Sequence, residues 1–476
     1  MTSIDLATVG AKADGTTPDT KIIQASIDKV HRTGGGTVQF ESGKTYLTGT
    51  LYLKSGVHLH LAPGARLVAS RDDVAYGSDT GVSPFPGEPL ERCLIYGRDC
   101  HDIALSGEGC IDGGGDEKSV WGSGPLAIRL ENCSRVVLRD LLLTNGRSWF
   151  VHLKHCDDVR LTGLKVVNRA QDGFNIDGCT DVRISDCDLK CGDDAICLGT
   201  SKTDRPVQNV TVTNCRMTSR WAAMRLGPLS KASIRNVAVS NCVFQDCGGG
   251  GIKMDPVEGG EVSDCTFSNI VMDTVAAPIV MVTGRWPEID ATKTERPLMP
   301  PGRIRDVRFS QMTIRATGEG PRPDRGGVLF LHGYNGAPIT NIVLADMDIR
   351  LPGGGTEADA SRRDLMDSDA MPWDRYGYWF TDKEAFGVPP AYGIYLRHVA
   401  GATFRGLRMR PESPDPRSAM FAMQCRDLDI RDVRVANDEG SAAILTAREC
   451  DGVDVADAYS RSAKTPMLKE EEGANR

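Results

Sequence analysis

The sequence lacks a run of about 18 consecutive apolar residues, the length that a membrane-spanning helix needs. This absence argues against a membrane protein. The first residues, Met1 to Thr17, also lack the apolar core of a secretory signal peptide. This favours a cytoplasmic protein, although a secreted mature form whose signal had been removed would begin in the same way.

The chain also lacks a basic block: 56 Lys and Arg stand against 64 Asp and Glu, a formal net charge of −8. An acidic protein of this kind is poorly suited to nucleic acid or to an anionic membrane surface. An acidic substrate would therefore have to be met by individual arginine and lysine side chains.

The fifteen cysteines include no pair of C-x-x-C units, so we expect no zinc site, and we predict no other metal and no cofactor. Instead, Cys110, Cys133, Cys156 and Cys179 follow one another at intervals of 23 residues. Disulfides or a redox function are one interpretation. We favour a ladder of reduced core cysteines, because Cys is among the most buried residue types. Such a ladder fits a reducing cytosol.

The same interval organises the residues around the cysteines. The phrases C-S-R-V-V-L, C-D-D-V-R-L and C-T-D-V-R-I begin at Cys133, Cys156 and Cys179. Short V-x-V strands between Gly, Asn and Asp turns at a fixed period, with almost no helical periodicity in the middle of the chain, indicate an all-β parallel solenoid. Stacked turns would form continuous sheets with apolar residues inside.

We predict one β-helix domain over residues 1–460. An amphipathic helix from Pro18 to Arg32, within a capping segment 17–33, would cover the open end of the solenoid, with Asp19 as its N-cap. Residues 461–476 are expected to form a solvated tail.

The repeat is lost between residues 352 and 390, a segment that contains Trp373, Tyr376 and Trp379. A long insertion in a compact protein is usually functional or disordered, and the aromatic density argues against disorder. The rings could stack on sugars and wall off one end of a cleft, which would favour exo action. They could equally pack the insertion onto the solenoid.

Asp172, Asp193 and Asp194 are the strongest candidates for a chemical site. Asp193 follows Asp172 by 21 residues, close to the repeat length, so the three carboxylates are expected to meet on one surface. Asp and Gly also make turns, but adjacent carboxylates beside an apolar run repel each other, which raises one pKa, as a general acid requires. Carboxylates one solenoid step apart could span the roughly 6.5–9.5 Å of an inverting glycosidase.

Four motifs occur in order: D-G-T at Asp14, G-E-G-C-I-D-G-G-G from Gly107 to Gly115, D-G at Asp172 and G-D-D-A-I from Gly192. Together they resemble the polygalacturonase-type glycoside hydrolases of family 28. The resemblance implies a right-handed parallel β-helix that hydrolyses pectic galacturonides with inversion and without a metal. It also implies that Asp193 is the general acid, while Asp172 and Asp194 hold and activate water.

Three family motifs are altered. N-T-D falls on Ala170-Gln171-Asp172, G-H-G on Trp221-Ala222-Ala223 and R-I-K on Lys253-Met254-Asp255. The family histidine is therefore missing, and an aspartate replaces a lysine. His332 or His398 could replace the histidine, although a lone histidine is more often structural.

Other side chains could bind the substrate carboxylate, since an arginine fork matches that group. Arg225 is the first choice, because its alternation with Met224 and Leu226 points it outward. Each arginine is equally well explained as a solvated surface residue. The other candidate substrate-binding residues are Lys253, Arg220, Arg285, Trp286, Arg397, His398, Trp373 and Trp379.

These features predict a glycosidase that degrades pectic cell-wall oligosaccharides of the galacturonide or rhamnogalacturonide type, inverting and exo-acting, as a monomer or small homo-oligomer. One alternative is a polysaccharide lyase or epimerase on the same scaffold, which would need a basic catalytic residue and often Ca²⁺. Another is a non-catalytic carbohydrate-binding solenoid. Fold alone does not decide among these.

Overall fold

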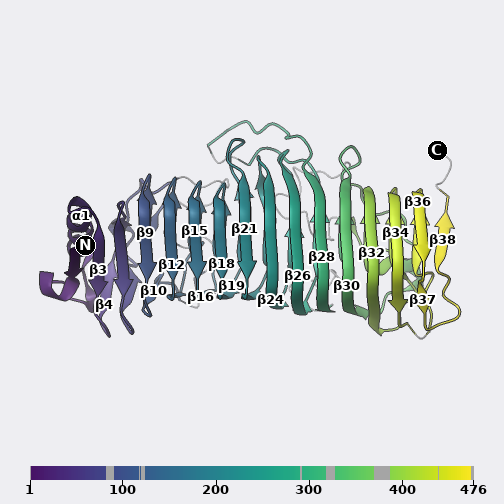
Figure 1. Cartoon of the computed structure of the whole chain (residues 1–476), viewed down its shortest axis with the longest axis horizontal. Coiled ribbons are helices and arrows are strands. Elements are labelled where there is room, and N and C mark those ends of the chain that lie inside the picture. The colour runs from purple at the N-terminus through teal and green to yellow at the C-terminus, as the bar shows by residue number, and fades with distance from the viewer. Residues whose placement is uncertain are drawn as a thin grey trace. The chain divides into compact units, whose positions relative to one another are not determined.

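The computed structural model describes residues 2–81, 91–116, 118–119, 124–289, 292–317, 327–368, 386–437 and 439–472. The chain forms two compact units, the first Met1–Ser219 with Ile289–Glu295 and the second Arg220–Glu288 with Arg296–Arg476. Each unit is a stack of parallel strands (Figure 1). The expectation of a single domain stays a prediction. No helix among the described residues is long and apolar enough to cross a membrane.

In the first unit, one sheet is built from one strand of each coil. Its register joins Ile128, Val151, Phe174 and Ile196, residues separated by 23, 23 and 22 positions. The repeat in the sequence is therefore one turn of a parallel β-solenoid, as predicted. The strands of this sheet are β5 (Leu51–Tyr52), β8 (Cys93–Arg98), β11 (Leu126–Glu131), β14 (Val151–Lys154), β17 (Phe174–Asp177) and β20 (Ile196–Thr200).

The remaining strands of the first unit form the other walls of the same coils. Those in one row are β1 (Thr2–Asp5), β3 (Gly36–Phe40), β6 (Val57–Leu61), β9 (His101–Ser106), β12 (Ser134–Arg139), β15 (Asp157–Thr162), β18 (Thr180–Ser185) and β21 (Val207–Thr213). Those in the other row are β2 (Asp14–Pro18), β4 (Thr45–Thr48), β7 (Arg66–Ala69), β10 (Cys110–Asp112), β13 (Leu142–Thr144), β16 (Lys165–Asn168), β19 (Asp188–Cys191) and β22 (Arg216–Ser219).

The second unit repeats this plan with longer strands. Its long strands are β24 (Ile234–Cys247), β26 (Glu261–Val275), β28 (Arg303–Ala316), β30 (Ile339–Gly353), β32 (Val399–Ser413) and β34 (Arg426–Val435), followed by β36 (Asp451–Ala456) and β37 (Tyr459–Ser460). Its other sheet holds β23 (Ala222–Ser230), β25 (Gly250–Met254), β27 (Ile279–Val282), β29 (Leu329–His332), β31 (Ala391–Arg397), β33 (Ser418–Met423), β35 (Leu445–Arg448) and β38 (Leu468–Glu471).

Many aspartate and asparagine residues lie in the turns between strands. Asp158, Asp181 and Asp186 have φ values of 50°, 55° and 57°, in the left-handed region that Asn and Asp tolerate better than other side chains. These residues are turn formers, as their spacing suggests. Asp172, Asp193 and Asp194 are described residues without a positive φ, so the turn geometry does not account for them.

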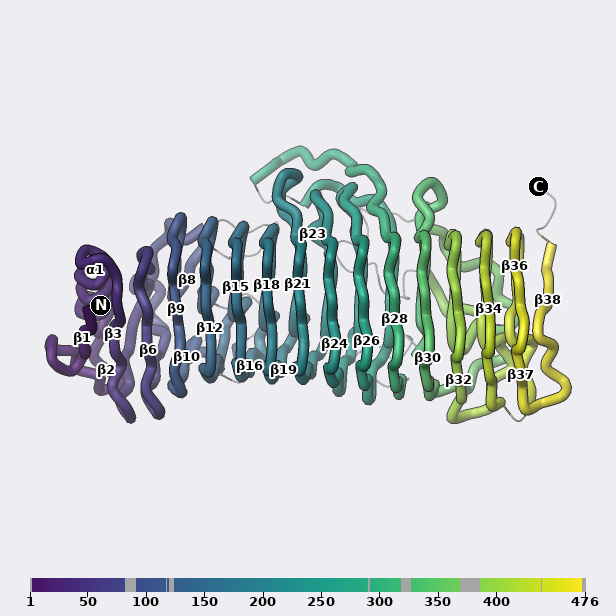
Figure 2. Tube along the Cα trace, in the orientation of Figure 1, coloured from purple at the N-terminus to yellow at the C-terminus, as the bar shows by residue number. Residues whose placement is uncertain are grey.

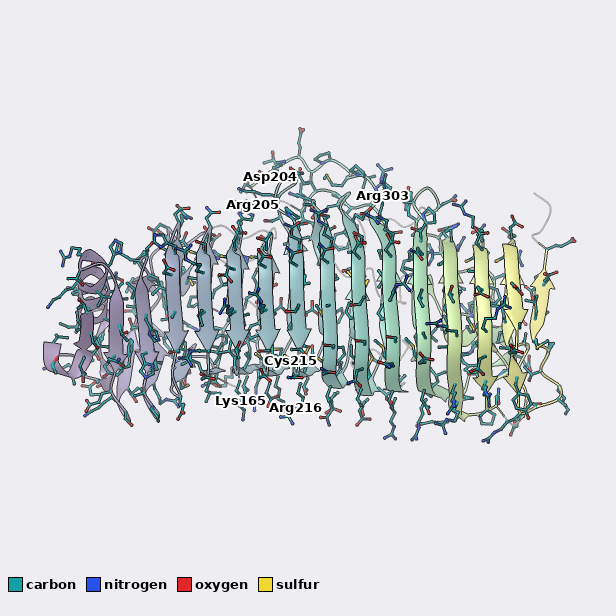
Figure 3. All side chains as sticks on the ribbon, viewed as in Figure 1. Lys165, Asp204, Arg205, Cys215, Arg216 and Arg303 are labelled. Atoms are coloured by element: carbon teal, nitrogen blue, oxygen red, sulfur yellow. The ribbon has the colours of Figure 1, made fainter. Side chains whose placement is uncertain are left out.

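The cysteines are all in the thiol form. All fifteen are free, and all but Cys197 and Cys450 are buried. Cys156 donates its backbone N–H to the Sγ atom of Cys179 on the next coil, at 3.2 Å. The predicted ladder of reduced core cysteines is confirmed, and the disulfide interpretation is wrong. Figure 3 labels one of them, Cys215.

The helix near the N-terminus is α1 (Thr20–Arg32), which lies beside β3 in Figure 1 and buries Ile23, Ile27 and Val30. It begins later than predicted, because Pro18 ends strand β2. Asp19 stands at the N-cap, but its carboxylate accepts hydrogen bonds from the backbone N–H groups of Lys12 and Ala13 at 2.7 and 2.9 Å. The predicted side-chain cap is therefore wrong, and Asp19 instead fixes the preceding loop.

The end of the second unit also differs from the expectation. Strand β38, labelled near the C-terminus in Figure 2, adds to β35, with Leu468 opposite Leu445, so this part of the predicted solvated tail belongs to the sheet. The predicted insertion begins later than residue 352, because β30 continues to Gly353. Helix α2 (Glu357–Ala360) follows with a capping box from Thr356. Trp373, Tyr376 and Trp379 lie outside the described residues.

Candidate active site

Three carboxylates meet in the first unit. Phe174 and Ile196 are register neighbours on adjacent coils. Asp172 stands two residues before the first and Asp194 two residues before the second, so the two aspartates occupy equivalent positions on neighbouring coils. Asp172, Asp193 and Asp194 each offer one carboxylate oxygen within 4.8 Å of the others. The predicted convergence of the three side chains is confirmed.

Asp172 is buried and held from two sides. The side-chain amide of Asn175 donates to its Oδ2 at 2.9 Å, and the backbone N–H of Asp194 donates to its Oδ1 at 3.0 Å. Hydrogen bonds donated to a carboxylate favour its ionised form. Asn168 donates its side-chain N–H to the backbone carbonyls of Asp172 and Ser148 at 2.6 and 2.8 Å, which fixes the turn that carries Asp172.

The backbone of Gly192 and Asp193 is also fixed. The N–H of Gly192 donates to the carbonyl of Asn168 at 2.7 Å, and the hydroxyl of Ser219 donates to the carbonyl of Asp193. The side chain of Asp193 is half-buried, whereas that of Asp194 is buried. Asp193 is thus the most accessible of the three carboxylates.

Position 192 requires glycine. A Cβ atom there would lie 1.9 Å from the carbonyl oxygen of Arg169, which is backbone and cannot move aside. We expect Gly192→Ala to displace the turn that carries Asp193, to lower kcat, and to destabilise the fold by about 1–3 kcal/mol, as overpacking does. Steady-state kinetics and urea unfolding would measure both effects. Gly336→Ala is the matched control, because its Cβ would meet only Tyr334 ring atoms at 3.9 and 4.0 Å. Equal effects of the two variants would contradict this account.

The three carboxylates lie close together. Their nearest oxygens are within 4.8 Å of one another, and the separation of roughly 6.5–9.5 Å between whole carboxyl groups, typical of inverting glycosidases, stays a prediction. One water molecule can donate a hydrogen bond to each of two carboxylates across such a gap, since each bond spans about 2.7–2.8 Å. The same oxygens are of the type that a hard cation such as Ca²⁺ or Mg²⁺ prefers. The arrangement can hold a water, and it can also hold a cation.

A second polar row lies on the same sheet, and sequence reasoning missed it. Arg129, His152 and Asn175 are register neighbours on β11, β14 and β17, with Cys197 next on β20. Arg129 donates its Nε–H to Nδ1 of His152 at 3.1 Å and an Nη1–H to the carbonyl of Thr80 at 2.8 Å. Burial and the charge of Arg129 hold the pKa of His152 well below its usual range, so the ring is neutral with Nε2 protonated. The recurrence of polar residues at 129, 152 and 175, again 23 apart, was the available signal.

Two of the three altered family motifs, at residues 221–223 and 253–255, lie in the second unit, where Arg225 on β23 is the register neighbour of Lys253 on β25. Arg225 is buried and donates to Asp255 through Nε at 3.2 and 3.1 Å and through Nη2 at 2.5 Å. The Nζ atom of Lys253 lies 4.8 Å from the ring centroid of Trp221. Asp255 is thus the ion-pair partner of Arg225, and the predicted outward-facing arginine is wrong in this respect.

The other predicted binding residues differ in how exposed they are. Arg220 is exposed and Arg285 half-buried. Trp286 is 1% exposed, so its side chain is not available to bind substrate, contrary to the prediction. Trp373 and Trp379 lie outside the described residues.

Arg397, His398 and His332 converge on Asp367. Nη2 of Arg397 lies 2.5 Å and Nε2 of His398 2.8 Å from Oδ2 of Asp367, and Nε2 of His332 lies 3.4 Å from its Oδ1. Burial alone would raise the pKa of Asp367, but the hydrogen bonds of the two histidines and the charge of Arg397 outweigh it and hold the pKa well below the usual range. These side chains anchor the start of the segment after α2, which gives both histidines a structural role.

This cluster predicts an acid-sensitive fold. Burial lowers the pKa of His332 from 6.5 to about 4, so between these pH values the unfolded chain binds more protons and stability falls as pH falls. The loss attributable to His332 amounts to about 3 kcal/mol on going from pH 7 to pH 4. Urea unfolding across this range should show a smaller pH dependence in His332→Gln than in the wild type. The exposed His31→Gln variant should retain the wild-type slope, and an unchanged slope in His332→Gln would contradict the assignment.

Comparison with known proteins gives one consistent family. The model of the family "Glycosyl hydrolases family 28" matches residues 79–361, more than half of the chain. A probable polygalacturonase from Vitis vinifera is 24% identical over 382 residues, 73% of this chain and 74% of the relative. An exo-poly-alpha-D-galacturonosidase from Dickeya chrysanthemi is 24% identical over 383 residues, 67% of this chain and 63% of the relative.

A solved structure supports the architecture. The family 28 exopolygalacturonase of Yersinia enterocolitica has a TM-score of 0.67 at 16% identity, over 90% of this chain and 78% of that one. The similarity confirms the predicted right-handed parallel β-helix.

Proposed function

Because the chain belongs to glycosyl hydrolases family 28, we propose that it hydrolyses pectic oligosaccharides of the galacturonide or rhamnogalacturonide type, with inversion and from a chain end. The observation that carries this proposal is the meeting of Asp172, Asp193 and Asp194, with carboxylate oxygens within 4.8 Å of one another. The names of the polygalacturonase relatives support the substrate class, and the exo-acting relative supports the mode of attack.

In the proposed reaction, Asp193 in its protonated form donates a proton to the glycosidic oxygen as the bond from that oxygen to the anomeric carbon breaks. A water held between Asp172 and Asp194 attacks the anomeric carbon from the opposite face and gives a proton to one of these two carboxylates. Asp193 takes the acid role because the family resemblance implies it, and its carboxyl group, the most accessible of the three, can reach a glycosidic oxygen. Asp172 suits the water-binding role, since the donors Asn175 and Asp194 favour its ionised form.

The test is product release from di-, tri- and polygalacturonate and from rhamnogalacturonan fragments, with and without EDTA. Hydrolysis predicts new reducing ends, insensitive to EDTA, and NMR should show the inverted anomer first. A chain-end mode predicts mono- or disaccharide as the earliest product from the polymer. Unsaturated products lost with EDTA would instead support a Ca²⁺-dependent lyase, the second candidate, which the cation-binding geometry of the three carboxylates favours.

We further propose that the enzyme works in a reducing compartment on oligosaccharides short enough to be imported. Fifteen free cysteines, most of them buried, are typical of proteins that fold where thiols stay reduced. Fractionation of the producing cells should find the protein in the cytosol. Recovery from the culture medium, or titration of fewer than fifteen thiols after unfolding, would contradict this location.

A further inference from the structure

A row of outward-facing side chains leads along the sheet of the first unit to the carboxylates. Its members are register neighbours, one on each of five successive strands of that sheet: Tyr52, Tyr96, Arg129, His152 and Asn175. They alternate along their strands with apolar core residues, so they lie on the outer face of the sheet. The row ends at the candidate site, because Asn175 donates to Oδ2 of Asp172 at 2.9 Å.

An irregular segment between β7 and β8, residues 70–81, lies against this row, and we call it the strap. Most of its residues are exposed, and Val74 is 87% exposed. Tyr76 and Thr80 are the exceptions, at 8% and 0% exposed. The strap is therefore a surface segment that is anchored to the coils at particular positions.

The first anchor fixes the beginning of the strap. Arg147, which lies between β13 and β14, donates an Nη2–H to the carbonyl of Ser70 at 3.0 Å and to the hydroxyl of Tyr76 at 3.3 Å. The Tyr76 hydroxyl donates to the same carbonyl at 2.5 Å. A positive side chain of the coil thus joins two points of the strap.

The row itself anchors the end of the strap. The hydroxyl of Tyr52 donates to Oδ1 of Asp79 at 2.6 Å. Arg129, three strands further along the sheet than β4's neighbour β5 in the row's own order of Tyr52, Tyr96 and Arg129, donates an Nη1–H to the carbonyl of Thr80 at 2.8 Å. From Asp79 to Thr80 the strap therefore advances along the row toward the carboxylates.

The backbone of the strap rests directly on Arg129. A Cβ atom at Gly81 would lie 2.3 Å from Nη1 of Arg129 and 2.8 Å from Oε1 of Glu131. The guanidinium is itself held, since its Nε–H donates to Nδ1 of His152 at 3.1 Å. Gly81 has a φ of 112°, a conformation that glycine adopts without strain. Glycine at this position lets the strap approach the guanidinium closely.

The outer face is closed on this side of the candidate site. Arg129 is 0% and His152 1% exposed, and the ring of Trp149 lies edge-on to His152, with centroids 5.1 Å apart. The strand of Arg129 lies two strand spacings, about 10 Å, from the strand of Asn175. A sugar chain that continued from the carboxylates over these coils would therefore meet the strap.

We propose that the strap closes the substrate-binding surface on the N-terminal side of the three carboxylates, and that Arg129 is the specificity-determining residue that holds it there. The inference rests on the hydrolysis proposed above and gives chain-end attack a structural cause. One end of an oligouronate would lie beside Asn175 against the strap, and the other sugars would extend away from it. Arg129 acts on the length of the product through Thr80 and takes no part in bond cleavage.

Two variants release the strap from opposite sides. Arg129→Met removes the donor to the Thr80 carbonyl, and Gly81→Ala adds a methyl group against the guanidinium at a φ of 112°. Exchange of the backbone amides of residues 76–81, followed by mass spectrometry, should become at least about tenfold faster in each, because a hydrogen bond to a charged group is lost. Gly10→Ala is the matched control: its φ is 96° and its Cβ would meet nothing within 4 Å, so exchange in the strap should stay at the wild-type rate.

The length of the first products tests the effect on specificity. The wild type should release mono- or disaccharide first from polygalacturonate, whereas both release variants should also form trisaccharides and longer fragments from the start. Gly81→Ala should hydrolyse digalacturonate at close to the wild-type rate. A merely structural defect would lower the rate on every substrate and leave the product length unchanged. If Arg129→Met does not fold, Tyr52→Phe replaces it, since this variant loses only the hydroxyl that binds Asp79.

The possible failures can be told apart. Terminal products alone from folded release variants whose strap exchanges faster would overturn the proposal, and so would unchanged exchange in both variants. Internal cleavage by the wild type would overturn the closure by the strap and the chain-end mode, while hydrolysis would stand. If the wild type cleaves no pectic substrate, the proposed function fails, and the exchange rates still decide whether Arg129 holds the strap.

Discussion

Asp193→Asn is expected to lower kcat on pectic oligosaccharides by a factor of about 10²–10⁴, the usual contribution of a general acid. Asparagine has nearly the same shape but cannot give a proton to the leaving oxygen. The backbone carbonyl of residue 193, which accepts a hydrogen bond from the hydroxyl of Ser219, is unchanged by the substitution. The fold and KM should therefore change little. Initial-rate kinetics on purified oligosaccharides would measure the effect.

Asp186→Asn is the matched control for this substitution. Asp186 is an exposed turn residue with a φ of 57°, a conformation that asparagine also adopts, so activity should stay at the wild-type level. If Asp194→Asn removed activity while Asp193→Asn retained it, the proposed roles of the two carboxylates would be wrong. A wild-type rate in all three variants with altered carboxylates, Asp172→Asn included, would remove the catalytic assignment altogether.

The solenoid could be predicted because the sequence repeats at nearly the same interval in successive coils. The register that joins Ile128 to Val151 and Phe174 follows the 23-residue interval of the cysteines. Buried side chains repeat at each coil because each strand stacks on a strand of similar pattern in the next coil. The same regularity explains why Asp172 and Asp194 meet, since both precede equivalent strands by two residues.

Contacts that do not follow the period were not predictable. Asp19 resembles a helix cap, but its carboxylate turns to the loop at Lys12 and Ala13. Trp286 lies beside a candidate arginine in the sequence, yet its ring is buried. The contacts of Asp19 and Trp286 depend on which other segments fold against them, and the sequence around each residue does not show this.

The environment of Arg225 was hidden for a related reason. Alternation with Met224 and Leu226 suggested an outward-facing side chain, but every residue of β23 is buried. It does not reveal that Asp255, two residues after the register partner Lys253, reaches back to the guanidinium. Asp255, which replaces the lysine of the family motif, and Arg225, which was expected to compensate for that change, form one ion pair.

Asp255→Ala is therefore expected to destabilise the protein by about 3–5 kcal/mol, because it leaves the buried guanidinium of Arg225 without its carboxylate. The side chains of this pair are 7% and 1% exposed, so water cannot replace the lost partner. Urea unfolding at neutral pH would measure the change. Removing both charges in the double variant Arg225→Met and Asp255→Leu should restore most of the stability, since apolar side chains of similar size tolerate the same site.

The exposed pair of Arg410 and Asp348 supplies the contrast. Its side chains are 44% and 36% exposed, so Asp348→Ala should cost less than about 1 kcal/mol. If Asp255→Ala also lowered the free energy of unfolding by less than about 1 kcal/mol, Arg225 would be hydrated once Asp255 is gone. In that case Arg225 would be free to meet a substrate carboxylate, and the variant should bind acidic oligosaccharides more tightly than the wild type. A large loss of stability that the double variant recovers would instead establish that the pair is structural, and that the substrate carboxylate is bound by other residues.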